Sequence, residues 1–281
     1  MSLRFVTLNT GLYRFGTLNW PIWAPVPHAA DRLPALAKAL SETSADVIAL
    51  QEVFTASDID YLQEVIGTDY PHCFYEKRSS GWVEGGLVVF SKYPAASFGF
   101  HQWKQDVLLE KVFVAKGFQR IELSLAEGKS LHLIHLHAVA GGWSDPESDS
   151  VETIRHNQFS EILDLANTTE PEAMVALGDF NAGPKVSECN YQQFLEAGFT
   201  DCFAETGQPA YTWDPKNALI GEGPHKDCPP QRIDHILVRN IRDISDSQIC
   251  FDEPVLATKP PLETMIPISD HYGLMSTLNP R

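Results

Sequence analysis

The sequence lacks any run of 18 or more apolar residues, although 43% of its 281 residues are hydrophobic. A helix that crosses a bilayer needs about 20 such residues, so the sequence predicts no membrane-spanning helix. The apolar residues are instead numerous enough for a large buried core. No repeat and no change in composition divides the chain, and we therefore expect one domain over residues 1–281.

Cysteine is scarce. The five cysteines are scattered, and no two of them form a C-x-x-C pair, which argues against a thiolate metal site. Their number is odd, and no charged segment followed by an apolar one precedes the first expected strand. Together these features favour a reduced, cytoplasmic setting.

Positive charge is also scarce, with 21 basic against 37 acidic residues and a formal net charge of −16. This balance argues against tight electrostatic binding of a long polyanion, and it makes a nucleic acid the less favoured partner. A phosphate-bearing substrate is still compatible with it, because bound metal ions can reverse the local charge. The absence of a G-x-S-x-G motif and of a Walker loop argues against a serine hydrolase and an ATP-binding site.

Short apolar runs recur along the chain and predict strands. They are LRFVTLN, DVIALQE, GGLVVFS, KGFQRIELSL, LHLIHLH, AMVALGDFN, RIDHILV and HYGLMSTL. Segments 29–43 and 151–167 have helical spacing, and we expect the first helix to begin near Arg32, with Pro34 in its first turn. Many strands with few helices between them predict an α+β fold, a four-layer α/β/β/α sandwich of two packed mixed sheets with outer helices.

Polar residues recur where these runs end. Glu52 interrupts the apolar segment 46–54, and a carboxylate at a buried strand end is costly unless a cation or a donor meets it. The other strand-end residues are Asn9, His135, His137, Asp179, Asn181, Asp234, His235, Asp270 and His271. Carboxylate and amide oxygens suit Mg²⁺ or Mn²⁺, and histidines can act as general acids and bases near neutral pH. The set therefore predicts metal-assisted hydrolysis of a phosphate ester.

Each piece alone has a simpler interpretation. Glu52 could be paired with a cation or face solvent, GDFN could be an ordinary turn, and SDH could cap a helix. We expect His132, His135 and His137 to share one strand face, on which at least one of them has only a structural role. The order of all six segments is much harder to obtain by chance than any one of them.

That order resembles the endonuclease/exonuclease/phosphatase superfamily, the deoxyribonuclease-like two-sheet sandwich. The resemblance runs from Asn9 to His271 through TLNT, LQEVF, HLHA, GDFNAGP, RIDHILV and SDHYGLM. The segments DVIALQEVFTASDIDYLQEVIGTDYP and GGLVVFSKYP are similar to the Mg²⁺-dependent neutral sphingomyelinases. The resemblance implies a phosphodiesterase that directs water in line at phosphorus. A nuclease of the same superfamily and a phosphatase acting on a small molecule are the alternatives.

The resemblance also implies a metal site. Glu52 would bind Mg²⁺ or Mn²⁺, with Asn9 beside it and Asp270 close to the metal. A binding module that has lost its chemistry is disfavoured, because every ligand position is present.

Catalytic roles are implied in the same way. Asp179 and Asn181 would orient the attacking water and the phosphate. Asp234 would hold the imidazole of His271, which would act as a base or as a phosphate contact. The histidine of IHLHA that matches the family's strand-end position is His135, which would contact the phosphate and assist the leaving group.

The expected substrate is a lipid or small-molecule phosphoester. Exposed aromatic residues in loops would allow peripheral contact with a lipid surface, and burial under their own loops is the alternative. The candidates for this contact are Trp20, Ile22, Trp23, Trp82 and Trp143.

Overall fold

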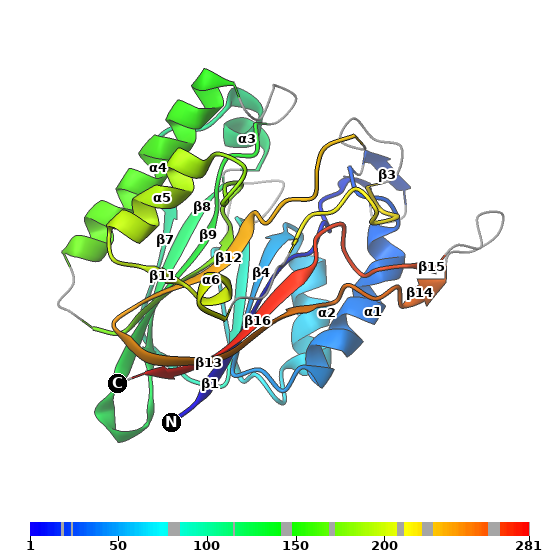
Figure 1. Ribbon diagram of the computed structural model, residues 1–281. Coiled ribbons are helices and arrows are strands. Elements are labelled where there is room, and N and C mark those ends of the chain that lie inside the picture. Colours follow the sequence, from blue (N-terminus) through cyan, green and yellow to red (C-terminus); the bar gives the residue numbers. More distant parts are fainter. Residues whose placement is uncertain are drawn as a thin grey trace.

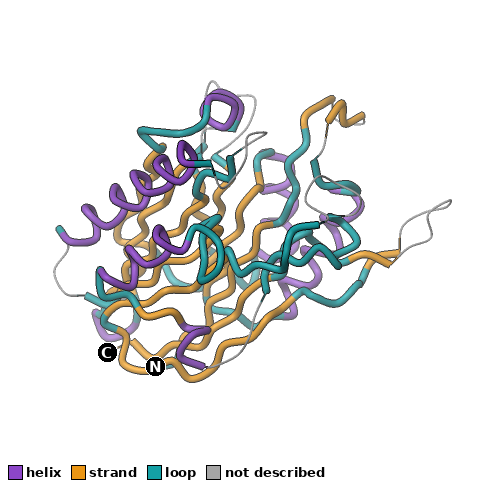
Figure 2. The backbone as a smooth tube through the Cα atoms, turned by 45° about the horizontal axis from the view of Figure 1, so that its top comes forward, coloured by secondary structure: helices purple, strands orange, loops and turns teal. Residues whose placement is uncertain are grey.

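The computed structural model describes residues 1–17, 20–23, 25–77, 85–114, 116–141, 148–168, 172–206, 211–220, 227–257 and 265–280. Two six-stranded sheets pack face to face, and helices cover the outer face of each (Figure 1, Figure 2). This architecture confirms the predicted sandwich. Within the described residues, no helix combines the length and the apolar character needed to cross a membrane.

The first sheet is mixed. From edge to edge its strands are β13 (Ile241–Cys250), β16 (Gly273–Pro280), β1 (Leu3–Asn9), β4 (Val47–Val53), β6 (Gly86–Ser91) and β5 (His72–Tyr75). β1 is parallel to β4 and antiparallel to β16. The helices α1 (Ala29–Glu42) and α2 (Ala56–Ile66) cover its outer face.

The second sheet is also mixed. Its strands, in order, are β11 (Thr200–Asp201), β12 (Asp234–Arg239), β10 (Met174–Asp179), β9 (Ser130–His137), β8 (Gly117–Ser124) and β7 (Ala95–Gln102). β9 is parallel to β10, and β12 is antiparallel to β10. The helices α4 (Asp149–Asn167) and α5 (Glu188–Glu196) cover the face that points away from the first sheet.

The smaller elements lie in the connections. They are α3 (Leu108–Phe113), a 3-10 helix (Ala126–Gly128), α6 (Cys202–Thr206) and the hairpins β2 (Phe15–Thr17) with β3 (Trp20–Trp23) and β14 (Leu256–Ala257) with β15 (Met265–Ile266). The start predicted for the first helix is wrong, because α1 begins at Ala29 and Pro34 lies beyond its first turn. Its first helical hydrogen bond runs from the Arg32 N–H to the His28 carbonyl, so that contact and not the proline sets the boundary.

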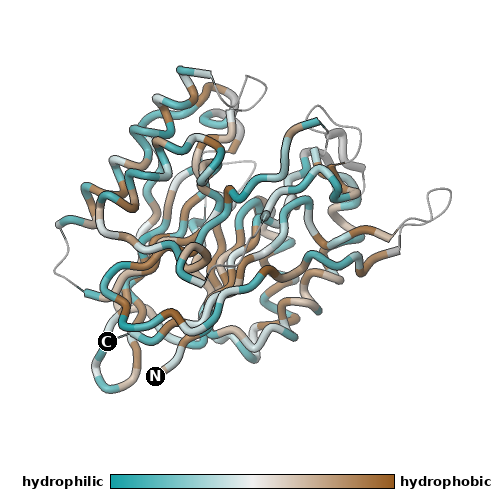
Figure 3. Tube along the Cα trace, in the orientation of Figure 1, coloured by the Kyte–Doolittle hydropathy of each residue, from teal (hydrophilic) through white to brown (hydrophobic). Residues whose placement is uncertain are grey.

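The core lies in three apolar layers. Strand residues such as Phe5, Ala49 and Leu177 fill the space between the sheets. Leu36 packs between α1 and the first sheet, and Phe159 between α4 and the second. Figure 3 shows hydrophobic residues gathered along the central strands, and hydrophobic and hydrophilic residues alternating along α4 and α5. Burial on both faces explains why the central strands have nearly continuous apolar sequences.

The strand directions bring polar ends to one edge of the sandwich. The parallel strands β1 and β4 end at Asn9 and Val53, just past Glu52, and β9 and β10 end at His137 and Asp179. The antiparallel strand β12 begins at the same edge, where Asp234 pairs with Asp179. The fold therefore gathers residues that are far apart in the sequence.

Phe159 provides a test of the outer core. It is fully buried, and its ring centroid lies 5.8 Å from that of Phe180 and 5.1 Å from that of Phe194. Phe159→Ala should lower the free energy of unfolding by about 3–5 kcal/mol in urea denaturation, because it leaves a cavity. Phe98→Ala, at a residue that is 38% exposed, is the control and should cost about 1 kcal/mol or less. Equal losses would contradict this description of the core.

Candidate active site

Glu52 lies in a β-bulge. Leu50 pairs with Val88 and Val53 with Gly86, so two residues of β4 oppose one residue of β6. Glu52 adopts a left-handed conformation with φ of 62°, which is strained for a residue other than glycine. A bulge of this kind re-aims a side chain. It explains how an apolar strand can end in a carboxylate that points into a site.

Asn9 links this carboxylate to the second sheet. Its Nδ2 donates to Glu52 Oε1 at 3.2 Å and to Asp179 Oδ2 at 3.0 Å. Its Oδ1 accepts a hydrogen bond from the Gly11 N–H at 3.1 Å. Asn9 therefore lies in the predicted place, but it bridges two carboxylates through its amide nitrogen, and the oxygen expected to bind metal is turned to the backbone.

The GDFN segment forms a turn that presents Asp179. The Asn181 N–H donates to Asp179 Oδ1 at 2.9 Å, and Asn181 has a left-handed φ of 48°. The Asn181 Nδ2 donates to the Ala138 carbonyl at 3.2 Å, which joins the turn to the end of β9. The motif therefore forms the turn of the simpler interpretation, and this turn places Asp179 beside Asn9 and His137.

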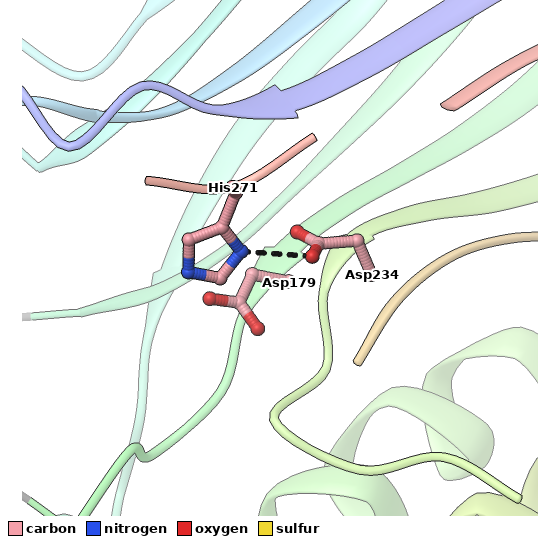
Figure 4. A group of neighbouring side chains, drawn as sticks. All are labelled: Asp179, Asp234 and His271. Carbon is pink, nitrogen blue, oxygen red and sulfur yellow. Dashed lines mark hydrogen bonds and ion pairs between the residues drawn. The ribbon is translucent and has the colours of Figure 1, made fainter. Parts of the chain in front are cut away.

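Asp234 holds His271. The His271 Nδ1 donates to Asp234 Oδ2 at 2.9 Å, as expected (Figure 4). Asp179, Asp234 and His271 each place one potential ligand atom within 4.8 Å of the others, and all three are buried. Asp234 Oδ1 is buried with no hydrogen-bond partner among the described residues. An additional cation or donor would satisfy this oxygen.

His137, not His135, lies at the carboxylates. The His137 Nε2 is 3.4 Å from Asp179 Oδ2 and 4.0 Å from Glu52 Oε1. His135 lies between the two sheets, where its ring nitrogens contact the side chains of Gln51 and Gln119. Within the described structure, no hydrogen bond or ion pair joins His135 to a carboxylate. The expectation that His135 contacts the phosphate therefore lacks the required geometry.

The expectation of one shared histidine face is also wrong. Successive side chains of a strand point to opposite faces, so His132 is out of phase with His135 and His137. His132 pairs with Glu172 on the helix side of the second sheet. Only the other two histidines point toward the first sheet.

A buried arginine that the sequence did not assign to the site joins the two loops next to Asp270. Arg32 is 0% exposed, and its guanidinium donates to the carbonyls of Thr10 and Ile268 at 2.7 Å each and to that of Gly11 at 2.5 Å. These bonds tie the loop after β1 to the loop before β16. A Cβ atom on Gly11 would lie 2.4 Å from Asp270 Oδ1, which shows how closely the two loops pack. The signal in the sequence was a charged residue on the apolar face of a helix.

Lys116 is a second missed cation. It is 6% exposed, and its Nζ lies 2.7 Å from Glu110 Oε2 and 3.4 Å from the Ala138 carbonyl. Although burial alone would lower the pKa of Lys116, the charges of Glu110 and Glu52 raise it above its ordinary value. Lys116 therefore stays charged beside the site.

The carboxyl groups of Glu52 and Asp179 both have raised pKa values. Burial, and then the charge of Asp270, raise the pKa of Glu52 to about 7. Burial, and then the charge of Asp234, raise the pKa of Asp179 to about 6. Carboxylates with raised pKa values and an unsatisfied buried oxygen on Asp234 fit a divalent cation bound by hard oxygen atoms.

His271 and His137 differ in charge. Burial would lower the pKa of His271, but the carboxylate of Asp234 and the charges of Asp270 and Asp179 raise it well above its ordinary value. Burial, followed by the charge of Lys116, holds the pKa of His137 well below the ordinary value. The site therefore contains one protonated and one neutral imidazole at neutral pH.

Glu52 should make the metal-free fold weaker as pH rises. A raised pKa in the folded state stabilises the fold below the unfolded value of 4.5, and that stability is lost as pH rises through about 7. In EDTA, wild type should lose stability relative to Glu52→Gln between about pH 5 and about pH 8, as followed by thermal unfolding. A constant difference between the two proteins across this range would contradict the pKa assigned to Glu52.

Comparisons with known proteins agree with this architecture. Residues 24–271 match the profile of the Endonuclease/Exonuclease/phosphatase family. Sphingomyelin phosphodiesterase 2 of Rattus norvegicus is 29% identical over 278 residues, which cover 92% of this chain and 62% of that protein. The chain thus spans less than two thirds of the length of this relative.

Solved structures share the fold. Sphingomyelinase C from Streptomyces griseocarneus has a TM-score of 0.75 at 19% identity, over 99% of this chain and 100% of that one. A substituted beta toxin from Staphylococcus aureus with bound magnesium ions has a TM-score of 0.72 at 18% identity, over 98% and 99%. D. rerio TDP2 with a single-strand DNA product has a TM-score of 0.72 at 19% identity, over 99% of each. With the profile match over most of its length, the chain belongs to the endonuclease/exonuclease/phosphatase family.

Proposed function

We propose that this protein is a Mg²⁺-dependent phosphodiesterase of the sphingomyelinase type, which hydrolyses the phosphodiester of a lipid head group with water. The observation that carries this proposal is the convergence of Glu52, Asp179, Asp234 and His271 at one edge of the two sheets. The likeness to sphingomyelin phosphodiesterase 2 over 92% of the chain supports the substrate class.

Glu52, Asp179 and Asp270 would supply oxygen ligands. The buried Asp234 Oδ1, which has no hydrogen-bond partner among the described residues, would supply a further one. Both Mg²⁺ and Mn²⁺ accept such a set, and we favour Mg²⁺ because the beta toxin with the same fold contains it. A bound divalent cation offsets negative charge on the phosphate and on the leaving oxygen. The backbone contacts of Arg32 would keep Asp270 in place beside it.

The protein's own groups can hold and move the protons. Because the pKa of His271 is raised well above its ordinary value, its ring carries a proton on each nitrogen: Nδ1 donates to Asp234, and Nε2 is suited to donate to a phosphate oxygen or to the leaving oxygen. Asp179 Oδ2 lies 3.4 Å from the neutral His137 and can orient water or accept its proton. Asn181 holds the turn that presents Asp179. This arrangement meets the general requirements of acid–base catalysis.

A zwitterionic lipid suits the charge of the protein. The net charge of −16 repels a long polyanion, whereas a head group with balanced charge avoids that repulsion. The structural likeness to TDP2 with a DNA product keeps a nuclease as the alternative. Lipid contact remains part of the proposal, but Trp82 and Trp143 and the side chains of Trp20, Ile22 and Trp23 lie outside the described structure.

A substrate panel tests the proposal. With Mg²⁺, the protein should hydrolyse sphingomyelin in vesicles faster than it nicks plasmid DNA, and excess EDTA should stop the reaction, since the buried acids need a cation. Glu52→Gln should lose most of the activity and keep its circular dichroism spectrum. Nicking of plasmid without hydrolysis of any phospholipid, in matched Mg²⁺, would identify a nuclease.

The loss of His137, the histidine that lies at the carboxylates, should lower turnover. His137→Gln should lower turnover by about 10² or more, as the loss of a positioned acid–base group typically does. His132→Gln is the matched control, because His132 lies on the same strand but faces the helices, and it should keep near wild-type turnover. Equal losses in the two variants would mean that general disruption of β9, and not the position of His137, causes the effect.

A further inference from the structure

A chain of buried polar side chains crosses between the two sheets next to the site. Gln51, His135 and Gln119 are all 0% exposed. The Gln51 Nε2 lies 2.7 Å from His135 Nε2, and the His135 Nδ1 lies 3.1 Å from Gln119 Oε1. The Gln119 Nε2 donates to the Leu87 carbonyl at 2.9 Å. We name these side chains the Gln51–His135–Gln119 chain.

The bonding of Gln119 fixes the direction of every hydrogen bond in this chain. Its nitrogen donates to a carbonyl, so its Oε1 faces His135 and must accept from an N–H on Nδ1. The His135 Nε2 is then the acceptor for the Gln51 amide. A neutral imidazole with one donor and one acceptor fits this place, and burial lowers the pKa of His135 to about 3.

Both ends of the chain lie at the β-bulge that carries Glu52. Gln51 is the bulged residue directly before Glu52, and Leu87 is the single residue that opposes the two. The Gln51 backbone carbonyl also accepts from the Thr10 N–H at 3.0 Å and from Thr10 Oγ1 at 2.8 Å, next to Asn9. The chain thus holds both strands of the bulge from the second sheet.

We propose that the Gln51–His135–Gln119 chain positions Glu52: it keeps the bulge in the strained conformation that turns this carboxylate into the site, and so sets the affinity for the divalent cation. The inference rests on the proposed metal-dependent function. A left-handed conformation at Glu52 persists only where its surroundings fix it, and the chain supplies contacts on both strands. His135 is then a positioning residue, and not the acid–base group expected from the sequence.

Cation binding separates this role from simple support of the core. Gln51→Met and His135→Leu keep approximate volume and remove the hydrogen bonds. Each should weaken Mn²⁺ binding, measured by electron paramagnetic resonance, by about 10-fold to 100-fold, as loss of a group that orients a metal ligand does. Turnover at saturating Mg²⁺ should stay within about threefold of wild type, because the groups that react are unchanged.

Ser276→Ala is the matched control. Ser276 is 1% exposed and bonds Ser247 at 2.9 Å within the first sheet, so its loss removes a buried hydrogen bond of another part of the sheet. It should lower the melting temperature and leave Mn²⁺ affinity unchanged. Wild-type Mn²⁺ affinity in Gln51→Met would overturn the proposal, because the chain would then serve only the core.

His135→Gln tests the role where the apolar variants do not fold. Glutamine keeps one donor and one acceptor, so this variant should keep turnover within about threefold and an unchanged pH profile, which loss of an acid–base group does not allow. A large loss of turnover with wild-type Mn²⁺ binding would restore the acid–base role and overturn the proposal.

A wild-type protein that binds Mn²⁺ but hydrolyses no phosphodiester would refute the proposed function alone. The effect of the variants on Mn²⁺ binding would still decide the inference.

Discussion

The cost of bringing several carboxylates together out of water governs this structure. Glu52 and Asp179 meet at the edge where the two sheets face each other, and the pKa values of both are raised. Arg32, from α1, and Lys116, from the residue just before β8, bring positive charge to the same region. Arg32 has its hydrogen bonds to backbone carbonyls, and Lys116 pairs with Glu110, so neither cation directly neutralises Glu52. A bound divalent cation would most simply offset the remaining negative charge of these carboxylates.

Turning Glu52 into the site also requires local backbone strain. A regular β4 would alternate its side chains between the two faces of the first sheet, and it could not turn Glu52 out of the ladder at the strand end. The bulge changes that direction, and Gly86 accepts a φ of 78° beside it, where a Cβ atom would lie 2.2 Å from the Phe54 ring. The conformation of this strand end therefore depends on the neighbouring strand β6 and on the Phe54 ring.

The sequence predicted the central strands and the sandwich because strands buried on both faces have continuous apolar sequences. It missed β7 and β13, whose residues are largely exposed and whose sequences have no such run. The polar residues at the ends of these apolar runs included Glu52, Asp179 and Asp234, because an apolar run that ends in a carboxylate stands out in the sequence. The resemblance selected His135, whereas His137 lies at the carboxylates; both point to one face and differ only by about 7 Å along the strand. That choice depends on which residues of the other sheet lie opposite, as do the contacts of Arg32.

The two imidazoles at the site show how one edge of the sandwich can divide acid from base. Both histidines are buried, and burial alone favours the neutral ring in each. His271 has a carboxylate on its Nδ1, whose charge outweighs burial, whereas His137 lies near the charge of Lys116. Environments that move two pKa values apart are typical of sites in which one group gives a proton while another accepts one. Because Asp234 begins β12 and His271 lies just before β16, one from each sheet, the packing of the two sheets also determines which histidine is charged.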